Sequence, residues 1–303
     1  MRIGTRGSPL ARAQAEEVLN RLIAAHPSLN GNIFIDIIKT TGDKFLKSSL
    51  SEIGGKGLFT KEIEEALIDK RIDLAVHSMK DVPTNLPSGL VIDCILPRVD
   101  PRDVLITTKT NNVKDLPQYS KIGTASLRRK AQLLRSRPDL EITIIRGNIG
   151  SRISKVMDGQ VDATLLAYAG LHRLGIYQKQ WSILSPEEML PAVAQGAIGI
   201  ERRENDEITA QVVKSLNCVE SQIRISTERA FLATLEGSCR MPIGALAEFV
   251  DSKVIKLRGL IADPDGKSHH EVERTALLSE AETLGKELGF ELKAQSKNNL
   301  WLN

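Results

Sequence analysis

Arginine residues gather in two neighbouring stretches of the 303-residue chain, GTASLRRK (123–130) and IIRGNIGSR (144–152). Each stretch follows an apolar run and leads into a predicted helix, so its side chains belong where a strand ends at the rim of a sheet. Guanidinium groups and the free N–H groups of a helix start both bind anions. We therefore expect the junction arginines to converge on a ligand with several carboxylates or phosphates. They are Arg128, Arg129, Arg146 and Arg152.

Arginine on a helix can instead belong to a solvated face that binds nothing. We expect this of Arg135 and Arg137, which lie later on the same predicted helix, just before Pro138. For the junction arginines, position favours the anion site, because loops that follow buried strands commonly carry binding residues.

A carboxylate and an ammonium group follow the predicted strand 73–78 directly, as Asp81 and Lys80 in MKDVP (79–83). A carboxylate at the carboxyl end of a strand can act as a general acid or base, or stabilise a developing cation. The alternative is an ordinary turn, in which Asp81 stabilises the bend and Lys80 is solvated. His77 is expected to point into the packed interior.

The three cysteines have different surroundings. Cys239 lies in the loop sequence LEGSCRMPIG (235–244) beside Arg240, a cation that favours the thiolate, so it is a candidate nucleophile or attachment point. An incidental loop cysteine is the alternative. Cys94 is expected in the core as a small hydrophobic residue, and the sequence does not decide the role of Cys218.

The composition is that of a globular chain, with 41% hydrophobic and 26% charged residues. A net charge of +3 and only 4% aromatic residues argue against a nucleic-acid-binding protein. No signal peptide, membrane span or metal-ligand spacing is evident. Unpaired cysteines indicate a reducing cytoplasm, and the lack of a large exposed apolar surface in the pattern indicates a monomer.

The first hundred residues alternate predicted strands and helices, which is typical of an α/β lobe. Ser8 is expected to cap a helix that has Pro9 in its first position. The apolar segment 32–39 is expected to be a buried strand, and the polar, glycine-rich segment 41–57 a mobile or functional loop. The other expected elements are strands at 2–5, 73–78 and 90–96 and a helix at 59–70.

A second alternating region begins after PRVDPRD (97–103), which we interpret as a linker because its prolines and alternating charges leave little to bury. Segment 191–203 supplies an apolar strand that crosses back to the first lobe. Two α/β lobes joined by paired linkers bind a ligand in the cleft between them. The tail has a long helix at 219–237, a strand meander turning at DPDG (263–266) and a helix at 279–294.

We therefore predict an α/β fold with two lobes around a cleft and a smaller C-terminal α+β domain. Lobe 1 is discontinuous, with residues 1–97 and 197–215, and lobe 2 spans 98–196. The C-terminal domain spans 216–303 and carries Cys239.

Seven segments resemble those of the porphobilinogen deaminases, also called hydroxymethylbilane synthases, in the same order along nearly the whole chain. They are TRGSPLA (5–11), AVHSMKDVP (75–83), GTASLRR (123–129), RGNIGSR (146–152), AGLHRLG (169–175), PAVAQGAIGIE (191–201) and GSCRMPIG (237–244). Each segment alone is weak evidence for the resemblance, but seven segments in the same order are specific to this family.

The resemblance implies lobes like those of the periplasmic binding proteins and a dipyrromethane cofactor joined to Cys239 by a thioether. It also implies the reaction, in which four porphobilinogen molecules condense head to tail into a linear hydroxymethylbilane with loss of ammonia. Each pyrrole carries an acetate and a propionate, so the growing chain needs many guanidinium groups. The segment 41–57 would act as a lid.

The resemblance also implies roles for individual residues of this sequence. Asp81 matches the catalytic carboxylate, with Lys80 beside it. Residues implied to hold the cofactor are Lys80, Asp81, Thr124, Ser126, Arg128, Arg129, Arg146 and Gly147, together with Cys239. Residues implied to bind substrate are Arg6, Ser8, Phe59, Arg146, Arg152, Arg173 and Gln195, with Phe59 offering its face to a ring.

Three other classes of protein compete with this interpretation. A non-catalytic bilobal protein that binds a polycarboxylate would give Cys239 no role. A nucleic-acid-binding protein that uses the helix at 127–136 would bind phosphates with a steep salt dependence. A cysteine hydrolase would need a histidine paired with Cys239, and the sequence shows none.

Overall fold

The computed structural model describes residues 1–44, 59–236 and 241–296. Two compact units are present: unit 1 comprises Met1–Val99 and Ala197–Gln222, and unit 2 comprises Asp100–Gly196 and Ile223–Asn303. The predicted α/β class, with a separate small C-terminal sheet and helix, is confirmed. The finer division into three domains stays a prediction.

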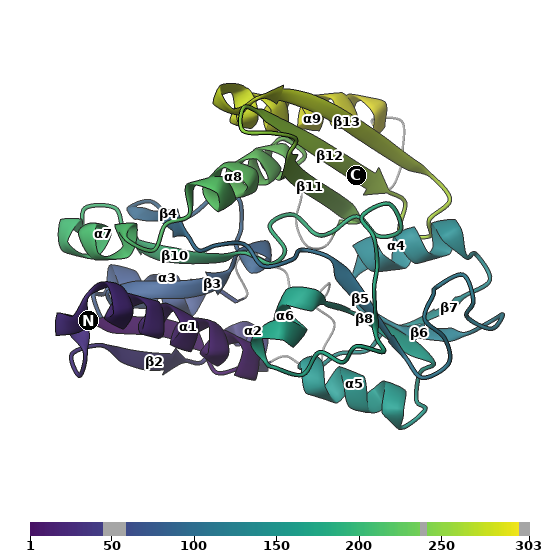
Figure 1. Ribbon diagram of the computed structural model, residues 1–303, viewed down its shortest axis with the longest axis horizontal. Coiled ribbons are helices and arrows are strands. Elements are labelled where there is room, and N and C mark those ends of the chain that lie inside the picture. Colours follow the sequence, from purple (N-terminus) through teal and green to yellow (C-terminus); the bar gives the residue numbers. More distant parts are fainter. Residues whose placement is uncertain (45–58, 237–240, 297–303) are drawn as a thin grey trace. The chain divides into compact units, whose positions relative to one another are not determined.

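Unit 1 is built on a five-stranded sheet with the strand order β2-β1-β3-β10-β4 (Figure 1). Its strands are β1 (Arg2–Arg6), β2 (Phe34–Ile38), β3 (Leu74–Ser78), β4 (Leu90–Ile95) and β10 (Ile198–Arg203). β1 is parallel to β2 and β3, whereas β10 is antiparallel to β3 and β4. β10 is the strand predicted to cross back into the first lobe, and it completes this sheet.

The longer helices of unit 1, at residues 9–25, 61–68 and 207–214, pack on this sheet through apolar faces. The helices are α1 (Pro9–Ala25), α2 (Thr41–Lys44), α3 (Lys61–Ile68), α7 (Glu207–Lys214) and the short turns η1 (Pro27–Leu29) and η2 (Met79–Asp81). The Ser8 hydroxyl caps α1 by accepting the Ala11 N–H at 3.3 Å, as predicted. One core cluster joins Leu22 of α1 to Ile3 and Leu74 of the sheet.

Unit 2 contains a second five-stranded sheet, with the order β7-β6-β8-β5-β9 (Figure 1). Its strands are β5 (Asp103–Thr107), β6 (Lys121–Gly123), β7 (Glu141–Thr143), β8 (Ala163–Ala167) and β9 (Ser182–Ile183). β6 is parallel to β7 and β8, and β5 is antiparallel to β8 and β9. β5 is thus the counterpart of β10 in unit 1: each is antiparallel to its neighbours, and each begins shortly after the chain passes from one unit to the other.

Three helices follow strands of this second sheet: α4 (Leu127–Ser136), α5 (Ile149–Met157) and α6 (Tyr168–Arg173). The Ser126 hydroxyl caps α4, accepting the Arg129 N–H at 3.4 Å. The Asn148 side chain accepts the Ser151 N–H at 2.8 Å and caps α5, which therefore begins at Ile149.

The C-terminal part of unit 2 combines a three-stranded antiparallel sheet with two helices (Figure 1). The elements are α8 (Val219–Thr234), whose residues up to Gln222 belong to unit 1, β11 (Ile243–Phe249), β12 (Val254–Ala262), β13 (His269–Leu277), η3 (Leu278–Glu280) and α9 (Ala281–Ser296). The predicted meander and its DPDG turn are confirmed, and so is the final helix.

Two predictions about burial were wrong. β2 is an edge strand, and its Phe34 and Ile37 side chains are 58% and 46% exposed, because it pairs with β1 on one side only. Arg137 is no solvated surface residue: its guanidinium donates to the carbonyls of Val113, Lys114 and Leu116. Arg137 therefore fixes the loop before β6 to the end of α4.

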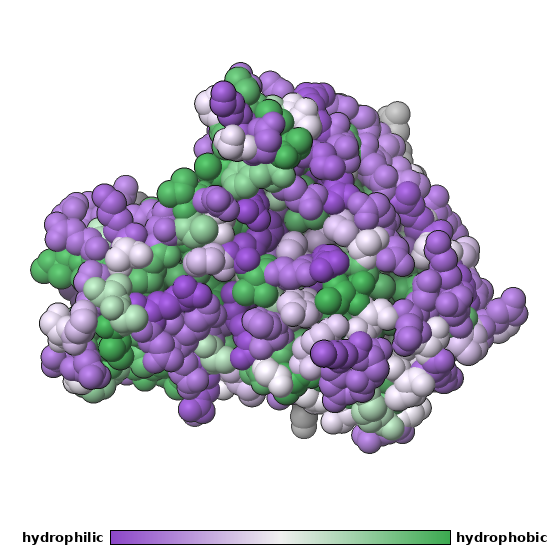
Figure 2. Space-filling model, in the orientation of Figure 1, coloured by the Kyte–Doolittle hydropathy of each residue, from purple (hydrophilic) through white to green (hydrophobic). Residues whose placement is uncertain are grey.

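On the face shown in Figure 2, hydrophilic residues predominate and hydrophobic ones are scattered. The large exposed hydrophobic side chains come from unrelated elements, for example Phe34 of β2, Ile208 of α7 and Phe290 of α9. Among the described residues, no helix is long and apolar enough to cross a bilayer.

Candidate functional site

The predicted residues of unit 1 lie where β1 and β3 end. The two strands are parallel neighbours, so their carboxyl ends share one edge of the sheet. Arg6 ends β1, and Ser8 follows as the cap of α1. At the end of β3, the Ser78 hydroxyl exchanges hydrogen bonds with the Gln14 side chain of α1, at 2.8 and 3.0 Å. This contact fixes the start of η2 against α1.

Asp81 and Lys80 lie on η2, immediately after β3. Met79 of the same turn is 2% exposed and anchors it in the core. The Asp81 side chain is exposed and that of Lys80 is half-buried. A buried methionine therefore holds a turn whose carboxylate faces solvent, which suits a group that must meet a substrate.

Arg6 and Phe59 are in contact within unit 1. The guanidinium carbon of Arg6 lies over the Phe59 ring, 4.1 Å from its centroid. A cation over an aromatic face is attracted by the ring quadrupole. The contact pre-orients both side chains.

Just before η2, β3 carries a buried contact between a histidine and a carboxylate that was not predicted from the sequence. Nε2 of His77 is 2.8 Å from Oε2 of Glu201 on β10, and both side chains are buried. Glu64 of α3 is also buried, and burial raises its pKa, with the charge of Glu201 acting in the same direction. His77 points inward, as expected, and ties β3 to β10 just before η2.

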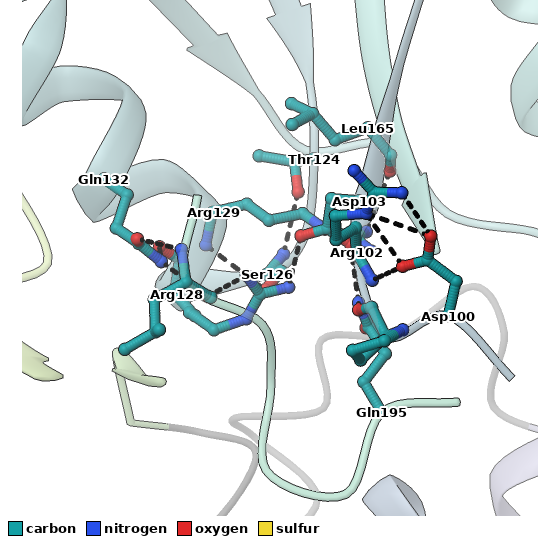
Figure 3. Close-up of polar contacts among 12 residues, drawn as sticks. Asp100, Arg102, Asp103, Thr124, Ser126, Arg128, Arg129, Gln132, Leu165 and Gln195 are labelled. Atoms are coloured by element: carbon teal, nitrogen blue, oxygen red, sulfur yellow. Dashed lines mark hydrogen bonds and ion pairs between the residues drawn. The ribbon is translucent and has the colours of Figure 1, made fainter. Parts of the chain in front are cut away.

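In unit 2, the Asp103 carboxylate at the head of β5 binds both arginines that begin α4 (Figure 3). Its Oδ2 accepts from Arg128 Nη2 at 2.8 Å and from Arg129 Nε at 3.3 Å, and its Oδ1 accepts from Arg129 Nη2 at 2.8 Å. The Gln195 side chain also donates to Oδ1, at 2.8 Å. We call these four residues the Asp103 cluster.

Every member of the Asp103 cluster is buried. Burial alone would disfavour the Asp103 carboxylate, but the charges and hydrogen bonds of Arg128 and Arg129 outweigh it and hold its pKa well below the ordinary range. Burial also lowers the pKa of Arg128, against the attraction of Asp103. One carboxylate balances two guanidinium groups, so the cluster keeps an excess positive charge.

Arg128 and Arg129 also bond to backbone carbonyls: Arg128 Nη1 donates to Leu190 and Arg129 Nη1 to Leu165, both at 2.8 Å. The Arg128 Nε–H has no hydrogen-bond partner although it is buried. A buried donor without an acceptor is costly unless a bound group completes it. The Arg128 Nε–H is thus a buried donor that a bound acceptor group would satisfy.

Thr124 and Ser126 form the turn between β6 and α4. The Thr124 hydroxyl accepts the Ser126 N–H at 3.1 Å, and Thr124 is buried whereas Ser126 is half-buried. The turn thus holds the start of α4, where N–H groups and the helix dipole favour an anion.

The second arginine stretch lies at the start of α5. β7 is the parallel neighbour of β6, so both stretches follow strand ends at the same edge of the sheet. Arg146 and Arg152 are half-buried, and Arg152 Nε donates to the Gly147 carbonyl at 2.9 Å. Gly147 has φ +118, a conformation that other residues rarely adopt.

Arg173 ends α6, and its Nη2 donates to the Gly196 carbonyl at 3.1 Å. Gln195, the neighbour of Gly196, is 1% exposed. Among the predicted residues of unit 2, Gln195, Arg128 and Arg129 are brought together through Asp103. Asp103 was not among the predicted site residues because it ends the stretch interpreted as a linker; an ionisable residue heading a mainly apolar strand was the available signal.

Two predictions lie outside the described residues. They concern Cys239, and the lid at 41–57 except for Thr41–Lys44, which form α2. Cys94 is 1% exposed, as expected, and burial raises the pKa of its thiol to about 12. Cys218 is partly buried and accepts a hydrogen bond from the Ser221 hydroxyl at 3.3 Å.

A groove of about 710 Å³ in unit 2 is lined by α4, β12 and β13. None of the predicted site residues lines it. Within the described ranges, no group of three or more His, Cys, Asp or Glu side chains is placed to hold a metal ion.

Two family models match the chain. The model described as porphobilinogen deaminase, dipyromethane cofactor binding domain, matches residues 1–211, and that of the porphobilinogen deaminase C-terminal domain matches residues 222–294. Both descriptions fit a chain with one large α/β part and a small C-terminal part.

Curated relatives match over nearly the full length. Porphobilinogen deaminase of Paracoccus denitrificans is 49% identical over 296 residues, covering 98% of this chain and 94% of the relative. The chloroplastic porphobilinogen deaminase of Pisum sativum is 52% identical over 301 residues, covering 98% and 82%. Among solved structures, a putative methionine-binding lipoprotein from Bacillus subtilis matches with a TM-score of 0.43 and 13% identity, covering 73% of this chain and 91% of that one.

The two family models and the curated relatives do not favour the alternative of a non-catalytic polycarboxylate-binding protein. The chain belongs to the porphobilinogen deaminase family, the dipyrromethane-containing transferases that condense four porphobilinogen molecules into the linear tetrapyrrole hydroxymethylbilane in haem biosynthesis.

Proposed function

We propose that Asp81 is the catalytic carboxylate of this enzyme and that Lys80 assists it. Each coupling releases ammonia from porphobilinogen, so the pyrrole left behind carries positive charge as the amine departs. A carboxylate at hydrogen-bonding distance of the pyrrole N–H stabilises that charge. The exposed Asp81 carboxylate on a core-anchored turn supports this role.

In unit 1 we propose that Arg6, Ser8 and Phe59 bind substrate. Arg6 supplies N–H donors for an acetate or propionate group. Phe59, already stacked under Arg6, offers a face to a pyrrole ring. Ser8 stands at the start of α1, where backbone donors favour an anion.

In unit 2 we propose that the excess positive charge of the Asp103 cluster attracts the acid groups of the oligopyrrole. This charge, together with the unpartnered Arg128 Nε–H, is the observation that carries the proposal. The other residues proposed to hold the dipyrromethane are Thr124, Ser126, Arg146 and Gly147 of unit 2 and Lys80 and Asp81 of unit 1. Arg146, Arg152, Arg173 and Gln195 are proposed to bind substrate.

The residues present fit a dipyrromethane, because its acid side chains match a strongly cationic set of donors with one orphaned buried N–H. When bound, the dipyrromethane supplies the primer on which the chain is extended. We propose Cys239 as its attachment point through a thioether, which keeps the primer on the enzyme when water releases the product.

The experiment on catalysis replaces Asp81 with Asn, which keeps the shape of the side chain and removes its charge. We expect kcat to fall about 10²- to 10⁴-fold with little change in KM. Asp69→Asn, at an exposed aspartate of the same unit, is the matched control. An Asp81→Asn enzyme within about threefold of the wild-type kcat would rule out the proposed role.

The experiment on binding replaces Arg146 or Arg152 with Gln. Loss of one charge-assisted hydrogen bond should raise KM for porphobilinogen about tenfold or more. Arg71→Gln is the control, since Arg71 is exposed and pairs with Asp69 on the surface. An unchanged KM in both variants would exclude these side chains from the substrate site.

We also propose that the enzyme works as a monomer in the cytoplasm. The free thiols of Cys94 and Cys218 suit a reducing compartment. Light scattering during gel filtration tests the assembly state, and a dimer mass would contradict it.

A further inference from the structure

One segment of unit 2, residues 190–196, joins the small C-terminal sheet to the Asp103 cluster; we call it the strap. The Leu190 carbonyl accepts from Arg128 Nη1 at 2.8 Å. The Pro191 carbonyl accepts the Ala245 N–H of β11 at 3.0 Å. The strap therefore contacts α4 through one residue and β11 through the next.

The middle of the strap has an unusual backbone conformation. Ala194 has φ +59, in the left-handed region that residues with a Cβ atom rarely adopt. Ala194 is also 1% exposed. A buried non-glycine residue keeps such a conformation only when its surroundings enforce it.

The side chain of Glu228 on α8 holds Ala194 in this conformation. Its side chain is 0% exposed. Its Oε2 accepts the Ala194 N–H at 2.7 Å, and its Oε1 accepts the Ala247 N–H of β11 at 2.8 Å. One buried carboxylate thus joins α8, β11 and the strap through backbone donors, which no change of neighbouring side chains removes.

The next residue carries the constraint to the arginines. The Gln195 side-chain amide donates to the Pro101 carbonyl at 2.7 Å and to Asp103 Oδ1 at 2.8 Å. Asp103 in turn holds Arg128 and Arg129 (Figure 3). A displacement of Ala194 would therefore move the Gln195 side-chain amide away from the Asp103 carboxylate, which orients both guanidinium groups.

We propose that Glu228 is a positioning residue, which acts through Ala194 and Gln195 to fix the arginine pair that binds the acid groups of the oligopyrrole. The proposal rests on the binding role given above to Arg128 and Arg129. It also links this pair to α8, the helix that ends at Thr234, shortly before Cys239 in the sequence. The Glu228 carboxylate thus lies on the helix that precedes the proposed attachment cysteine, and through Ala194 and Gln195 it also positions the arginines proposed to bind the acid groups of the primer.

The test uses the full-length enzyme with its cofactor and the variant Glu228→Gln. The amide side chain keeps one oxygen acceptor, so one of the two N–H groups loses its partner. We expect hydrogen exchange of the Ala194 amide to accelerate about tenfold and KM for porphobilinogen to rise about five- to tenfold, with the cofactor mass retained. Asp162→Asn is the matched control, because Asp162 also accepts a backbone N–H in unit 2, that of Lys121 at 2.7 Å, far along the chain from the strap.

A second variant separates positioning from a merely structural role. Glycine adopts positive φ without the steric cost that alanine bears, so Ala194→Gly in the Glu228→Gln background should restore about half or more of the lost kcat/KM on a logarithmic scale. Asp162→Asn should gain nothing from the same change. A KM in Glu228→Gln equal to that of Asp162→Asn, or no recovery with Ala194→Gly, would overturn the proposal.

Failure of the inference is distinguishable from failure of the binding role on which it rests. If Arg129→Gln leaves KM unchanged, the arginine pair does not bind substrate and both proposals fall. If Arg129→Gln raises KM whereas Glu228→Gln does not, only the positioning role of Glu228 is lost.

Discussion

Replacing Asp103 with Asn should destabilise unit 2 far more than the loss of an ordinary ion pair. Asparagine has nearly the same shape but no charge, and it sets an amide NH₂ against donors from Arg128, Arg129 and Gln195. Removing one partner of a buried ion pair costs about 3–5 kcal/mol, because the remaining charge stays buried. Here two guanidinium groups would remain, both of them buried.

The assay is urea unfolding combined with hydrogen exchange measured peptide by peptide, because a chain with two compact units does not unfold as one two-state system. The free energy of opening is read from amides of β5 and α4. The control, Asp162→Asn, removes a partly exposed partner of Lys109 and should cost only about 1 kcal/mol.

Equal losses of opening free energy in Asp103→Asn and Asp162→Asn would contradict the view that Asp103 compensates a buried charge. That result would mean that the Arg128 and Arg129 side chains leave the interior when Asp103 is neutral, so that no uncompensated charge stays buried. The predicted result is a difference of about 2 kcal/mol or more between the two variants.

The depressed pKa of Asp103 also fixes a pH dependence: its stabilisation is complete above the ordinary carboxylate pKa of about 4 and is lost only as pH falls below it. Urea midpoints of the wild type and Asp103→Asn should therefore differ by a constant amount above about pH 5 and converge in stronger acid; convergence on raising the pH would contradict this. Gly147→Ala should cost about 1–3 kcal/mol, because φ at Gly147 is +118 and an added Cβ would lie 2.1 Å from a serine hydroxyl oxygen. Gly159→Ala, at φ +70 with open space, should cost less, and the reverse order of thermal midpoints would count against the described turn. Burial raises the pKa of Cys94 to about 12, so a thiol reagent at pH about 8 should leave Cys94 unmodified while it labels the partly buried Cys218; peptide mapping that finds Cys94 labelled first would contradict its place in the core.

Elements with a local signal were predictable from the sequence. α4 was predicted at its observed bounds, 127–136, because Ser126 caps it and apolar residues recur along one face. The apolar run before the first arginine stretch and the strand at 73–78 also carry a local signal, so the residues that follow them could be singled out. The arginines and Asp81 lie in these positions.

Features decided by distant pairings were not predictable. The 32–39 segment is mostly apolar, yet Phe34 and Ile37 of β2 are exposed because the order of strands puts β2 at an edge. Asp103 stands in a proline- and charge-rich stretch, and only the entry of β5 into the sheet beside β8 buries it against the arginines. The same holds for Glu228, whose partners Ala194 and Ala247 are brought to it by the tertiary fold.

The intact masses of the purified enzyme and of Cys239→Ser show whether an oligopyrrole is covalently attached to this cysteine. The wild-type mass should exceed that of the sequence by one dipyrromethane, and Cys239→Ser should lack this addition, while Cys218→Ser keeps it. A fully active wild-type protein without the added mass, or an adduct that persists in Cys239→Ser, would contradict an oligopyrrole anchored at this cysteine.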